Sequence, residues 1–406
     1  MPSRLLASTR TMKAQTDAEV KAEVEAKVKD PELKDPERGV QRMRAAVLTR
    51  FGDPLTVREM ATPVAGGGEV LVETLAGSVA PYAGDVFSGV RDYPLEPPVV
   101  PGLGGVGRVV QVGPDATRLR QGDLVWCDPT VRSRDDALTP DITLQGWSSR
   151  GDGGARLAEH LHDGSYAEFM RVPTENVFRL PAEAADDPAR WCSLGFHAIA
   201  YGGLLAGGLE AGETLLAGGA TGNLGSCAVA VALAMGAGRV VAPGRNRAVL
   251  DSLVTRFGSR VRPVGLTGDE AVDRAAMSTA AGGPIDMVID LLPPAAPASV
   301  ARTAAMTVRE YGRVVLMGGV GMLGGADFAL PYPWIMRNSV TVRGQWMYPR
   351  TANLGMIRLI ESGALDLGAE RVRTFPLDDI NTAIEYAAAH AGPFDRTVLV
   401  PRSAHG

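Results

Sequence analysis

The residues with the clearest chemical potential form a glycine-rich turn at 219–225. An apolar run at 214–217 that favours a strand precedes it, and an apolar run at 226–235 that favours a helix follows it. In this setting glycines let main-chain N–H groups approach a pyrophosphate, and the start of the helix stabilises the negative charge. We therefore predict that the turn binds a dinucleotide rather than only packing the sheet. Its residues are Gly219, Ala220, Thr221, Gly222, Asn223, Leu224 and Gly225.

The end of the next predicted strand, at 239–242, indicates which dinucleotide is bound. About 20 residues beyond such a turn, enzymes that use NAD place an acidic residue on the ribose 2′-hydroxyl. Here Gly244 holds that place and is followed by Arg245 and Asn246, with Arg247 close by. A small residue leaves room for a 2′-phosphate and a guanidinium can bind it bidentately, whereas a carboxylate would repel it. The sequence predicts NADP(H) over NAD(H); the alternative is that Arg245 is only a solvated surface charge.

Strands alternate with helices between residues 188 and 344, which is typical of a doubly wound parallel sheet. Gly318 and Gly319 follow a predicted strand at 312–317. At the end of such a strand, glycine lets the backbone approach the nicotinamide carboxamide. We therefore expect a nucleotide-binding α/β domain at 188–344 that includes both glycines in the cofactor site.

Residues 43–187 show a different pattern from residues 188–344: short apolar or β-branched runs are separated by Gly, Pro and Asp. It predicts a small β-barrel, to which residues 345–403 return. The long polar stretch at 129–163 shows no period and is interpreted as a lid or a disordered loop. Residues 1–42, with alternating Lys and Glu and two Asp-Pro-Glu breaks, are interpreted as a disordered extension outside the fold.

The composition excludes several classes of protein. The 406 residues carry a formal net charge of −5, so nothing in the overall charge favours binding to nucleic acid or an anionic membrane surface. The sequence has no apolar run long enough to span a membrane. The three cysteines are far apart and offer neither a disulfide framework nor a zinc knuckle, which favours a reducing compartment. We expect a cytoplasmic protein.

Several segments, taken in order, resemble the medium-chain dehydrogenase/reductase superfamily from Met43 to Pro401. The resemblance implies a Rossmann domain plus a GroES-like β-barrel domain, with the substrate between them. The segments are Pro98 to Gly113, Arg120 to Val125, Gly164 to Glu168, Gly282 to Asp290, Gly312 to Gly319 and Arg396 to Pro401.

The departures from this family are informative. Where its zinc enzymes carry a Cys, this chain has Ala80 and Pro81, and where they carry His-Glu it has Leu103-Gly104. A catalytic zinc needs three protein ligands. The family's structural zinc needs four cysteines, and the matching region has only Cys127. The sequence predicts no metal site and resembles the zinc-free branch of quinone oxidoreductases and enoyl reductases.

Without a metal, the charge that develops on the acceptor must be stabilised by a hydrogen-bond donor, and tyrosine is suited to this. Tyr82 lies on the segment that, by the resemblance, faces the nicotinamide. Tyr93 resembles a tyrosine that some zinc-free enoyl reductases use as proton donor. Asp85 matches a recurrent aspartate of the family, which orders its loop or takes part in catalysis. For both tyrosines an ordinary packing role is the alternative.

These features predict an NADPH-dependent oxidoreductase that transfers a hydride to an activated C=C bond or a quinone without zinc. The expected substrate is a small apolar conjugated carbonyl compound or quinone. One alternative is a zinc-free NADP-dependent alcohol dehydrogenase or carbonyl reductase. Another is a catalytically silent NADP(H)-binding sensor or scaffold. Residues 339–346 resemble the strand that pairs across family dimers, so we expect a homodimer.

Overall fold

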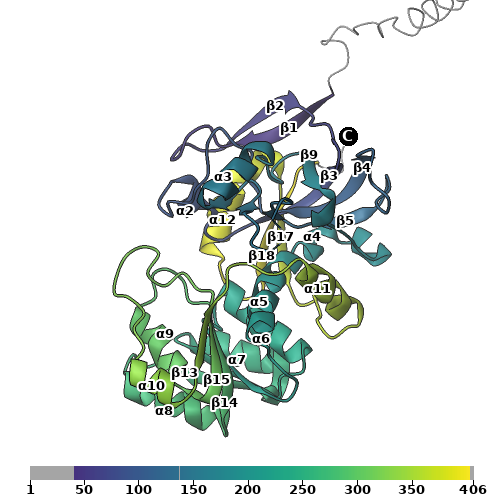
Figure 1. The fold of residues 1–406 in the computed structure, drawn as a ribbon. Helices are drawn as coiled ribbons and strands as arrows, with labels where there is room; N and C mark the ends of the chain where they lie inside the picture. Colours follow the sequence, from purple (N-terminus) through teal and green to yellow (C-terminus); the bar gives the residue numbers. More distant parts are fainter. Residues whose placement is uncertain (1–40, 137, 403–406) are drawn as a thin grey trace, which may run out of the picture. The chain divides into compact units, whose positions relative to one another are not determined.

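The computed structural model describes residues 41–136 and 138–402 (Figure 1). Contacts between residues divide the chain into two units, Met1–Arg42 and Met43–Gly406. The predicted extension lies almost wholly outside the described residues.

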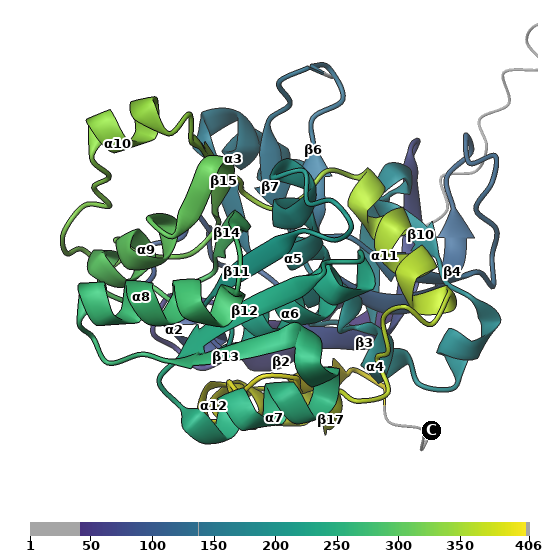
Figure 2. The same cartoon turned by 90° about the horizontal axis from the view of Figure 1, so that it is seen from below.

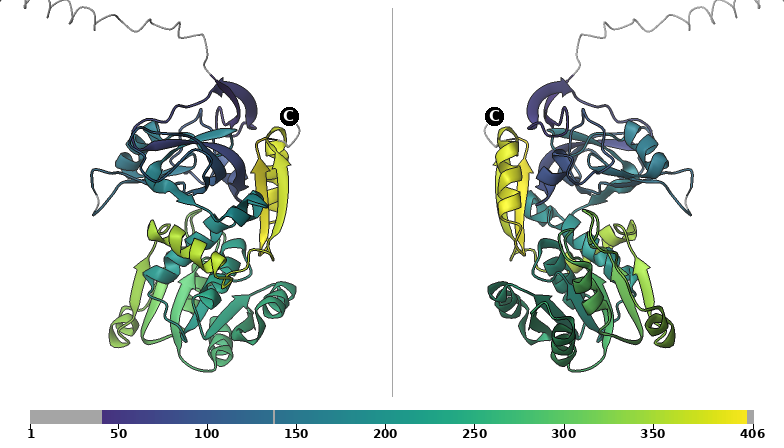
Figure 3. Two further views of the ribbon diagram at one scale, coloured as in Figure 1. Left: turned by 90° about the vertical axis from the view of Figure 1, so that its right-hand side faces the viewer. Right: turned by 90° about the vertical axis from the view of Figure 1, so that its left-hand side faces the viewer.

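A seven-stranded sheet combines the first part of the chain with its end. The strand order is β10-β5-β4-β3-β18-β17, and β9 pairs with β3. The antiparallel pairing of β18 with β3 brings the carboxyl-terminal strands alongside the first sheet, as Figure 3 shows. The end of the chain therefore contributes two strands, β17 and β18, to the first sheet. The strands are β3 (Glu69–Val79), β4 (Gly105–Val112), β5 (Leu124–Cys127), β9 (Phe169–Pro173), β10 (Val177–Arg179), β17 (Arg371–Pro376) and β18 (Asp395–Val400).

Smaller elements surround this sheet. β1 and β2 form a two-stranded sheet of their own. An apolar core under the sheet contains residues of α2 and α12, together with Trp147 and Tyr166. This core places α2, which follows the end of β3, among buried aromatic rings. These elements are β1 (Arg42–Val47), β2 (Thr56–Ala61), α2 (Ala83–Phe87), α4 (Pro188–Trp191) and α12 (Ile380–Ala389).

A second sheet of six parallel strands has the order β13-β12-β11-β14-β15-β16. Its central strands are buried on both faces, which explains their continuous apolar sequence. The strand order reverses at β11, and in such sheets the ligand crevice lies at this point, beyond the carboxyl ends of the strands. The strands are β11 (Thr214–Gly218), β12 (Arg239–Gly244), β13 (Val261–Gly265), β14 (Ile285–Asp290), β15 (Val308–Leu316) and β16 (Thr341–Gly344).

Helices cover both faces of this parallel sheet, as Figures 1 and 2 show. One apolar core joins the sheet to α5, α6, α7 and α11, and another joins it to α8 and α9. The predicted doubly wound sheet is therefore confirmed. The helices are α5 (Leu194–Ala206), α6 (Asn223–Ala234), α7 (Arg247–Phe257), α8 (Glu270–Ala281), α9 (Ala298–Ala305), α10 (Tyr332–Arg337) and α11 (Thr351–Glu361).

The interpretation of residues 129–163 as a lid or disordered loop was wrong. This stretch forms β6 (Thr130–Arg132), β7 (Ile142–Leu144), β8 (Ser148–Arg150) and α3 (Gly151–His160). The three strands pair antiparallel in a sheet of their own. Strands of three residues are too short to show an alternating pattern, although the apolar side chains of β7 are buried.

Buried charges join the two sheets. Arg396 of β18 is fully buried, and its Nε lies 2.9 Å from Oε2 of Glu370. The other carboxylate oxygen of Glu370 lies 3.4 Å from Nε2 of His197 on α5, and Arg396 also donates to Sγ of Cys227 on α6, at 3.0 Å. Burial lowers the pKa of His197 to about 3, so this side chain is neutral at ordinary pH. The charge of Glu370 is therefore balanced by Arg396.

Candidate functional site

The glycine-rich turn brings two stretches of backbone closer together than any other residue type would permit. Gly219 has a φ of +80°, in the region that favours glycine. A Cβ on Gly225 would lie 1.9 Å from the carbonyl oxygen of Gly219, and one on Gly222 would lie 3.3 Å from the same atom. The turn is therefore the tight, glycine-dependent connection predicted from the sequence.

The first turn of α6 is free to bind an anion. Its N-cap residue, Gly222, provides no side-chain cap, so the amide groups that follow have no side-chain acceptor. α6 begins three residues earlier than predicted, which places Asn223, Leu224 and Gly225 inside that first turn. These uncapped N–H groups fit the phosphates of a dinucleotide.

Asn223 was predicted to contact the cofactor, and its side chain has another function in the structure. The amide nitrogen donates to the carbonyl oxygens of Gly392 and Asp395, at 3.3 and 3.0 Å. These carbonyls lie at the start of β18. Asn223 therefore ties the glycine-rich turn to the first sheet, and its side chain is already engaged in this contact.

Gly244 lies at the end of β12, where an acidic residue would favour NAD. A Cβ on Gly244 would lie 2.3 Å from Cγ2 of Thr221, a residue of the glycine-rich turn. Thr221 therefore occupies the space that a carboxylate side chain would need. Asn246, predicted as a cofactor contact, accepts a hydrogen bond from the amide of Val249 and caps α7. Arg245 is exposed next to it.

A buried carboxylate that was not predicted lies at the same edge of the sheet. Asp290 ends β14, is 6% exposed, and has one oxygen without a hydrogen-bond partner among the described residues. Burial raises its pKa to about 6, although the amides of Leu292 and Gly318 oppose this by hydrogen bonding. An unpaired carboxylate at the crevice adds to the polar surface that a bound cofactor would meet.

Gly318 and Gly319 pack against protein rather than leaving open space. Cβ atoms on them would lie 2.4 Å from Oδ2 of Asp290 and 2.7 Å from Cγ of Pro294, respectively. The amide of Gly319 donates to the carbonyl of Leu292 at 2.8 Å. Both glycines therefore hold the end of β15 against the segment that follows β14.

Tyr82 and Tyr93 lie in one aromatic cluster at the start of α2. The ring of Tyr82 meets Trp147 edge-on, with centroids 5.9 Å apart. The guanidinium of Arg91 lies over the Tyr82 ring, 4.1 Å from its centroid. Burial raises the pKa of Tyr82 well above its ordinary value; Tyr93 adds to this, and Arg91 partly offsets it. The phenol therefore stays protonated at neutral pH and is available as a hydrogen-bond donor.

Asp85, predicted as a candidate catalytic residue, faces the same arginine. Its carboxylate lies 3.5 Å from Nε of Arg91, and its side chain is 54% exposed. Arg91 in turn covers the ring of Tyr82. This arrangement favours a role in ordering the loop. Arg91 and Trp147 are the members of this cluster that sequence reasoning missed.

The residues at the expected zinc positions do not fit a metal. Ala80 and Leu103 have no donor atoms, and a Cβ on Gly104 would lie 2.2 Å from the carbonyl oxygen of Cys127. A glutamate in that backbone conformation would therefore clash. Among residues 41–136 and 138–402, no three His, Cys, Asp or Glu side chains gather in a way that could hold a metal ion.

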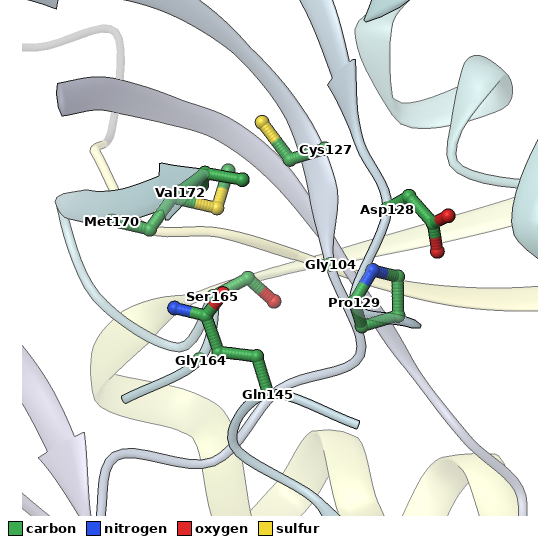
Figure 4. A pocket seen from close by; sticks show the side chains of 9 residues that line it. All are labelled: Gly104, Cys127, Asp128, Pro129, Gln145, Gly164, Ser165, Met170 and Val172. Carbon is green, nitrogen blue, oxygen red and sulfur yellow. The ribbon is translucent and has the colours of Figure 1, made fainter. Parts of the chain in front are cut away.

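A cavity near Cys127 is too small to be the substrate site. It has a volume of about 10 Å³, and Figure 4 shows Gln145, Ser165 and Met170 among the side chains around it. Such a volume holds one water molecule at most. The hydroxyl of Ser165 has no hydrogen-bond partner among the described residues, which fits a buried water.

Two family models match the chain. The alcohol dehydrogenase GroES-like domain matches residues 66–182, and the zinc-binding dehydrogenase domain matches residues 223–362. The chain belongs to the medium-chain dehydrogenase/reductase superfamily, with a GroES-like domain and a Rossmann domain, as the resemblance implied. No helix among the described residues is long and apolar enough to cross a membrane.

Individual relatives differ in what their names say about cofactor and substrate. An alcohol dehydrogenase of Rhizobium meliloti is 34% identical over 48% of this chain and 55% of its own length. An NAD-dependent alcohol dehydrogenase of Saccharolobus solfataricus is 25% identical over 88% of this chain and 100% of its own. An acryloyl-coenzyme A reductase of Metallosphaera sedula is 30% identical over 54% of this chain and 63% of its own. The matched segment thus spans little more than half of the first of these relatives.

Solved structures share the fold. A zinc-binding dehydrogenase of Sinorhizobium meliloti 1021, solved with NADP bound, superposes with a TM-score of 0.72 at 21% identity. The match covers 89% of this chain and 100% of that one. At 21% identity this structural similarity shows a shared fold and no more.

Asp290 predicts a pH dependence of cofactor binding. Above about pH 6 its carboxylate is charged and repels a nucleotide phosphate; below that pH it is neutral. We expect NADPH affinity to rise by roughly tenfold, ~1.4 kcal/mol, between pH 7.5 and 5. In Asp290→Asn this rise should be much smaller. Fluorescence titration at each pH measures the effect.

Asp286→Asn is the matched control, because this aspartate begins the same strand at its other end and pairs with Arg309. The cofactor's 2′-phosphate also titrates in this range. The comparison is therefore made between proteins at each pH. Equal pH profiles for the wild type and Asp290→Asn would contradict a role for this carboxylate.

Proposed function

We propose that this chain is an NADPH-dependent reductase that transfers a hydride to an activated C=C bond or a quinone without zinc. Two features together support the proposal. The positions where zinc ligands would be expected have no metal-binding atoms, and a protonated tyrosine lies two residues from one of them. Ala80 and Leu103 offer no metal ligands, and Tyr82 follows Ala80 by two residues. Trp147 and Arg91 fix its ring.

The chemistry divides between cofactor and protein. Bound NADPH supplies the hydride. Addition of a hydride to the β-carbon of a conjugated carbonyl moves an electron pair to the carbonyl oxygen. The Tyr82 phenol donates a hydrogen bond to that oxygen, which stabilises the charge. A proton then reaches the α-carbon from a tyrosine or from water, with Tyr93 as the nearby second phenol.

Conjugation makes this metal-free reaction feasible. Negative charge that spreads over an enolate or a quinol needs less stabilisation than charge confined to one alkoxide oxygen. One phenolic donor can provide it. A zinc-free alcohol dehydrogenase or carbonyl reductase is the second candidate, supported by the relatives named alcohol dehydrogenase.

The cofactor proposal depends on the end of β12. Thr221 fills the place of an acidic side chain at Gly244, and Arg245 is exposed beside it. The glycine-rich turn and Gly244 bind the phosphates, with Gly318 and Gly319 supporting the nicotinamide end through their packing.

We also propose that the protein is a homodimer in the cytoplasm. β16 ends the order of the parallel sheet, and its four residues are exposed. An open strand edge of this kind favours pairing with a second copy. The three cysteines are free and buried, which suits a reducing compartment.

A panel of acceptors tests the reaction. We expect quinones, enals, enones or enoyl thioesters to oxidise NADPH, and simple aldehydes to react at least about tenfold more slowly. Prolonged dialysis against a chelator should leave turnover unchanged. Turnover of simple aldehydes alone would favour the carbonyl reductase. Tight NADPH binding without turnover of any acceptor would favour a sensor or scaffold, and zinc-dependent turnover would refute the proposal.

Tyr82→Phe tests the phenol. Removal of a general acid or oxyanion donor should lower kcat by roughly a hundredfold. The dissociation constant of NADPH should not change, because the ring and its packing remain. Tyr332→Phe, an exposed tyrosine on α10, is the matched control. If Tyr93→Phe lowers kcat and Tyr82→Phe does not, the roles of the two tyrosines are reversed.

Arg245→Ala tests cofactor choice. Loss of a charge-assisted hydrogen bond to the 2′-phosphate should raise the KM for NADPH by roughly tenfold and spare NADH. Steady-state kinetics with both coenzymes measures this. Equal effects on NADPH and NADH would remove Arg245 from the 2′-phosphate site.

A further inference from the structure

A groove of about 480 Å³ lies between the β7–β8 hairpin, the end of α5 and the segment after β16. Its volume is typical of small-molecule sites. Three arginines line it, Arg132, Arg150 and Arg343, together with Trp346. They come from two parts of the sequence, the sheet of β6 to β8 and the segment of β16 and the residues after it, so no local motif identifies them.

None of these arginines forms an ion pair within the described part of the chain. Arg132 donates to the carbonyls of Thr130 and Tyr348. Arg150 donates to the carbonyl of Pro140 at 3.1 Å, and Arg343 to that of Ala206 at 3.2 Å. Main-chain carbonyls hold the guanidinium groups in place without neutralising their charge. The groove therefore offers concentrated positive charge to a ligand.

The position of Arg132 strengthens this point. Its side chain is partly buried, and burial lowers its pKa; the nearby charges of Arg350 and Arg150 act in the same direction. The buried carboxylate of Asp128 opposes this shift, but it is bonded to Tyr348 and Asn353. Like charges held this close repel one another, and an anion between them would relieve that repulsion.

Trp346 adds a flat apolar surface. Its side chain is 41% exposed, and the guanidinium of Arg150 lies 5.7 Å from its ring centroid. An exposed indole beside guanidinium groups suits a ligand that carries both phosphates and an aromatic base. Stacking of bases on aromatic side chains is a favourable contact that proteins use to bind single-stranded nucleic acids, and it tolerates any base.

Two segments of the chain connect the groove to the tyrosine cluster. The β7–β8 hairpin carries Arg150 into the groove and places Trp147 against Tyr82. Next to Trp346 along the chain, Met347 packs against both the apolar core of Tyr82 and that of α5. A ligand whose reactive end lies at Tyr82 could therefore extend a long tail along these segments to the arginines.

We propose that this groove binds the phosphate-bearing, nucleotide-like tail of the acceptor, so that the substrate is an anionic conjugate rather than a small apolar molecule. This inference rests on the proposed function for the site at Tyr82. It assigns Arg132, Arg150, Arg343 and Trp346 to substrate recognition.

One experiment compares two acceptors that differ only in the tail. The same enoyl group is offered as its coenzyme A thioester, which carries phosphates and adenine, and as its pantetheine thioester, which carries neither. The wild type should prefer the coenzyme A thioester in kcat/KM. Arg150→Gln and Arg343→Gln should each lower that preference by roughly tenfold. Arg337→Gln, an exposed arginine of α10 outside the groove, should leave it unchanged.

Direct binding forms a second arm. Calorimetry with 3′,5′-ADP is done on protein saturated with NADP⁺, so that the cofactor site is filled. We expect one further site, weakened roughly tenfold in Arg150→Gln. Equal use of the two thioesters by the wild type would overturn the assignment to the acceptor. Arginine-dependent binding of 3′,5′-ADP in that case would assign the groove to a separate nucleotide.

The two arms also separate this inference from the proposed function. If no acceptor is reduced, the proposed function fails, and the calorimetry alone decides whether the groove is an anion site. If acceptors are reduced and 3′,5′-ADP does not bind, the groove assignment fails while the reductase stands.

Discussion

The contact between Gly225 and the carbonyl of Gly219 is the constraint on which the rest of the site depends. With no space for a Cβ, the first turn of α6 closes directly onto the end of β11. This fixes the uncapped amides of α6 at the point where the strand order reverses. It also places Thr221 against Gly244 and directs the Asn223 side chain away from the crevice toward β18. The shape of the turn, the contact of Thr221 with Gly244 and the attachment to the first sheet thus follow from one close backbone approach.

The parallel sheet was predictable because its strands are buried on both faces and its helices are continuous. The strands predicted at 214–217 and 239–242 correspond to β11, Thr214–Gly218, and β12, Arg239–Gly244. The region at 129–163 was not predictable, because its strands of three residues have no period and are defined only by their partners. The start of α6 was missed for a similar reason, since glycine and asparagine in its first turn favour a loop when considered without the cap.

The candidate site was likewise predictable only in part. Local motifs predicted the tight glycine-rich turn, which the structure contains, and singled out the segment of Tyr82. They did not identify Arg91 on Tyr82 or Trp147 beside it, since these contacts join separate segments. Asp290 ends the segment from Gly282 that resembles the family. An acidic residue at the carboxyl end of an apolar run was the one sequence feature that could have indicated it. The assignment of Asn246 to the cofactor overlooked that an asparagine before a helix is a strong capping residue.

The buried pair of Arg396 and Glu370 holds β17 to β18, because Glu370 directly precedes β17 and Arg396 lies in β18. Separation of these two residues would leave a charge in an apolar core without its counterion, which typically costs about 3–5 kcal/mol. The same pair contacts the helices of the second sheet, through Glu370 to His197 on α5 and through Arg396 to Cys227 on α6. The hydrogen bonds from Asn223 to Gly392 and Asp395 attach the glycine-rich turn to the same strand pair. A substitution that removes either charge would therefore loosen the carboxyl-terminal strands and, with them, the support of the turn.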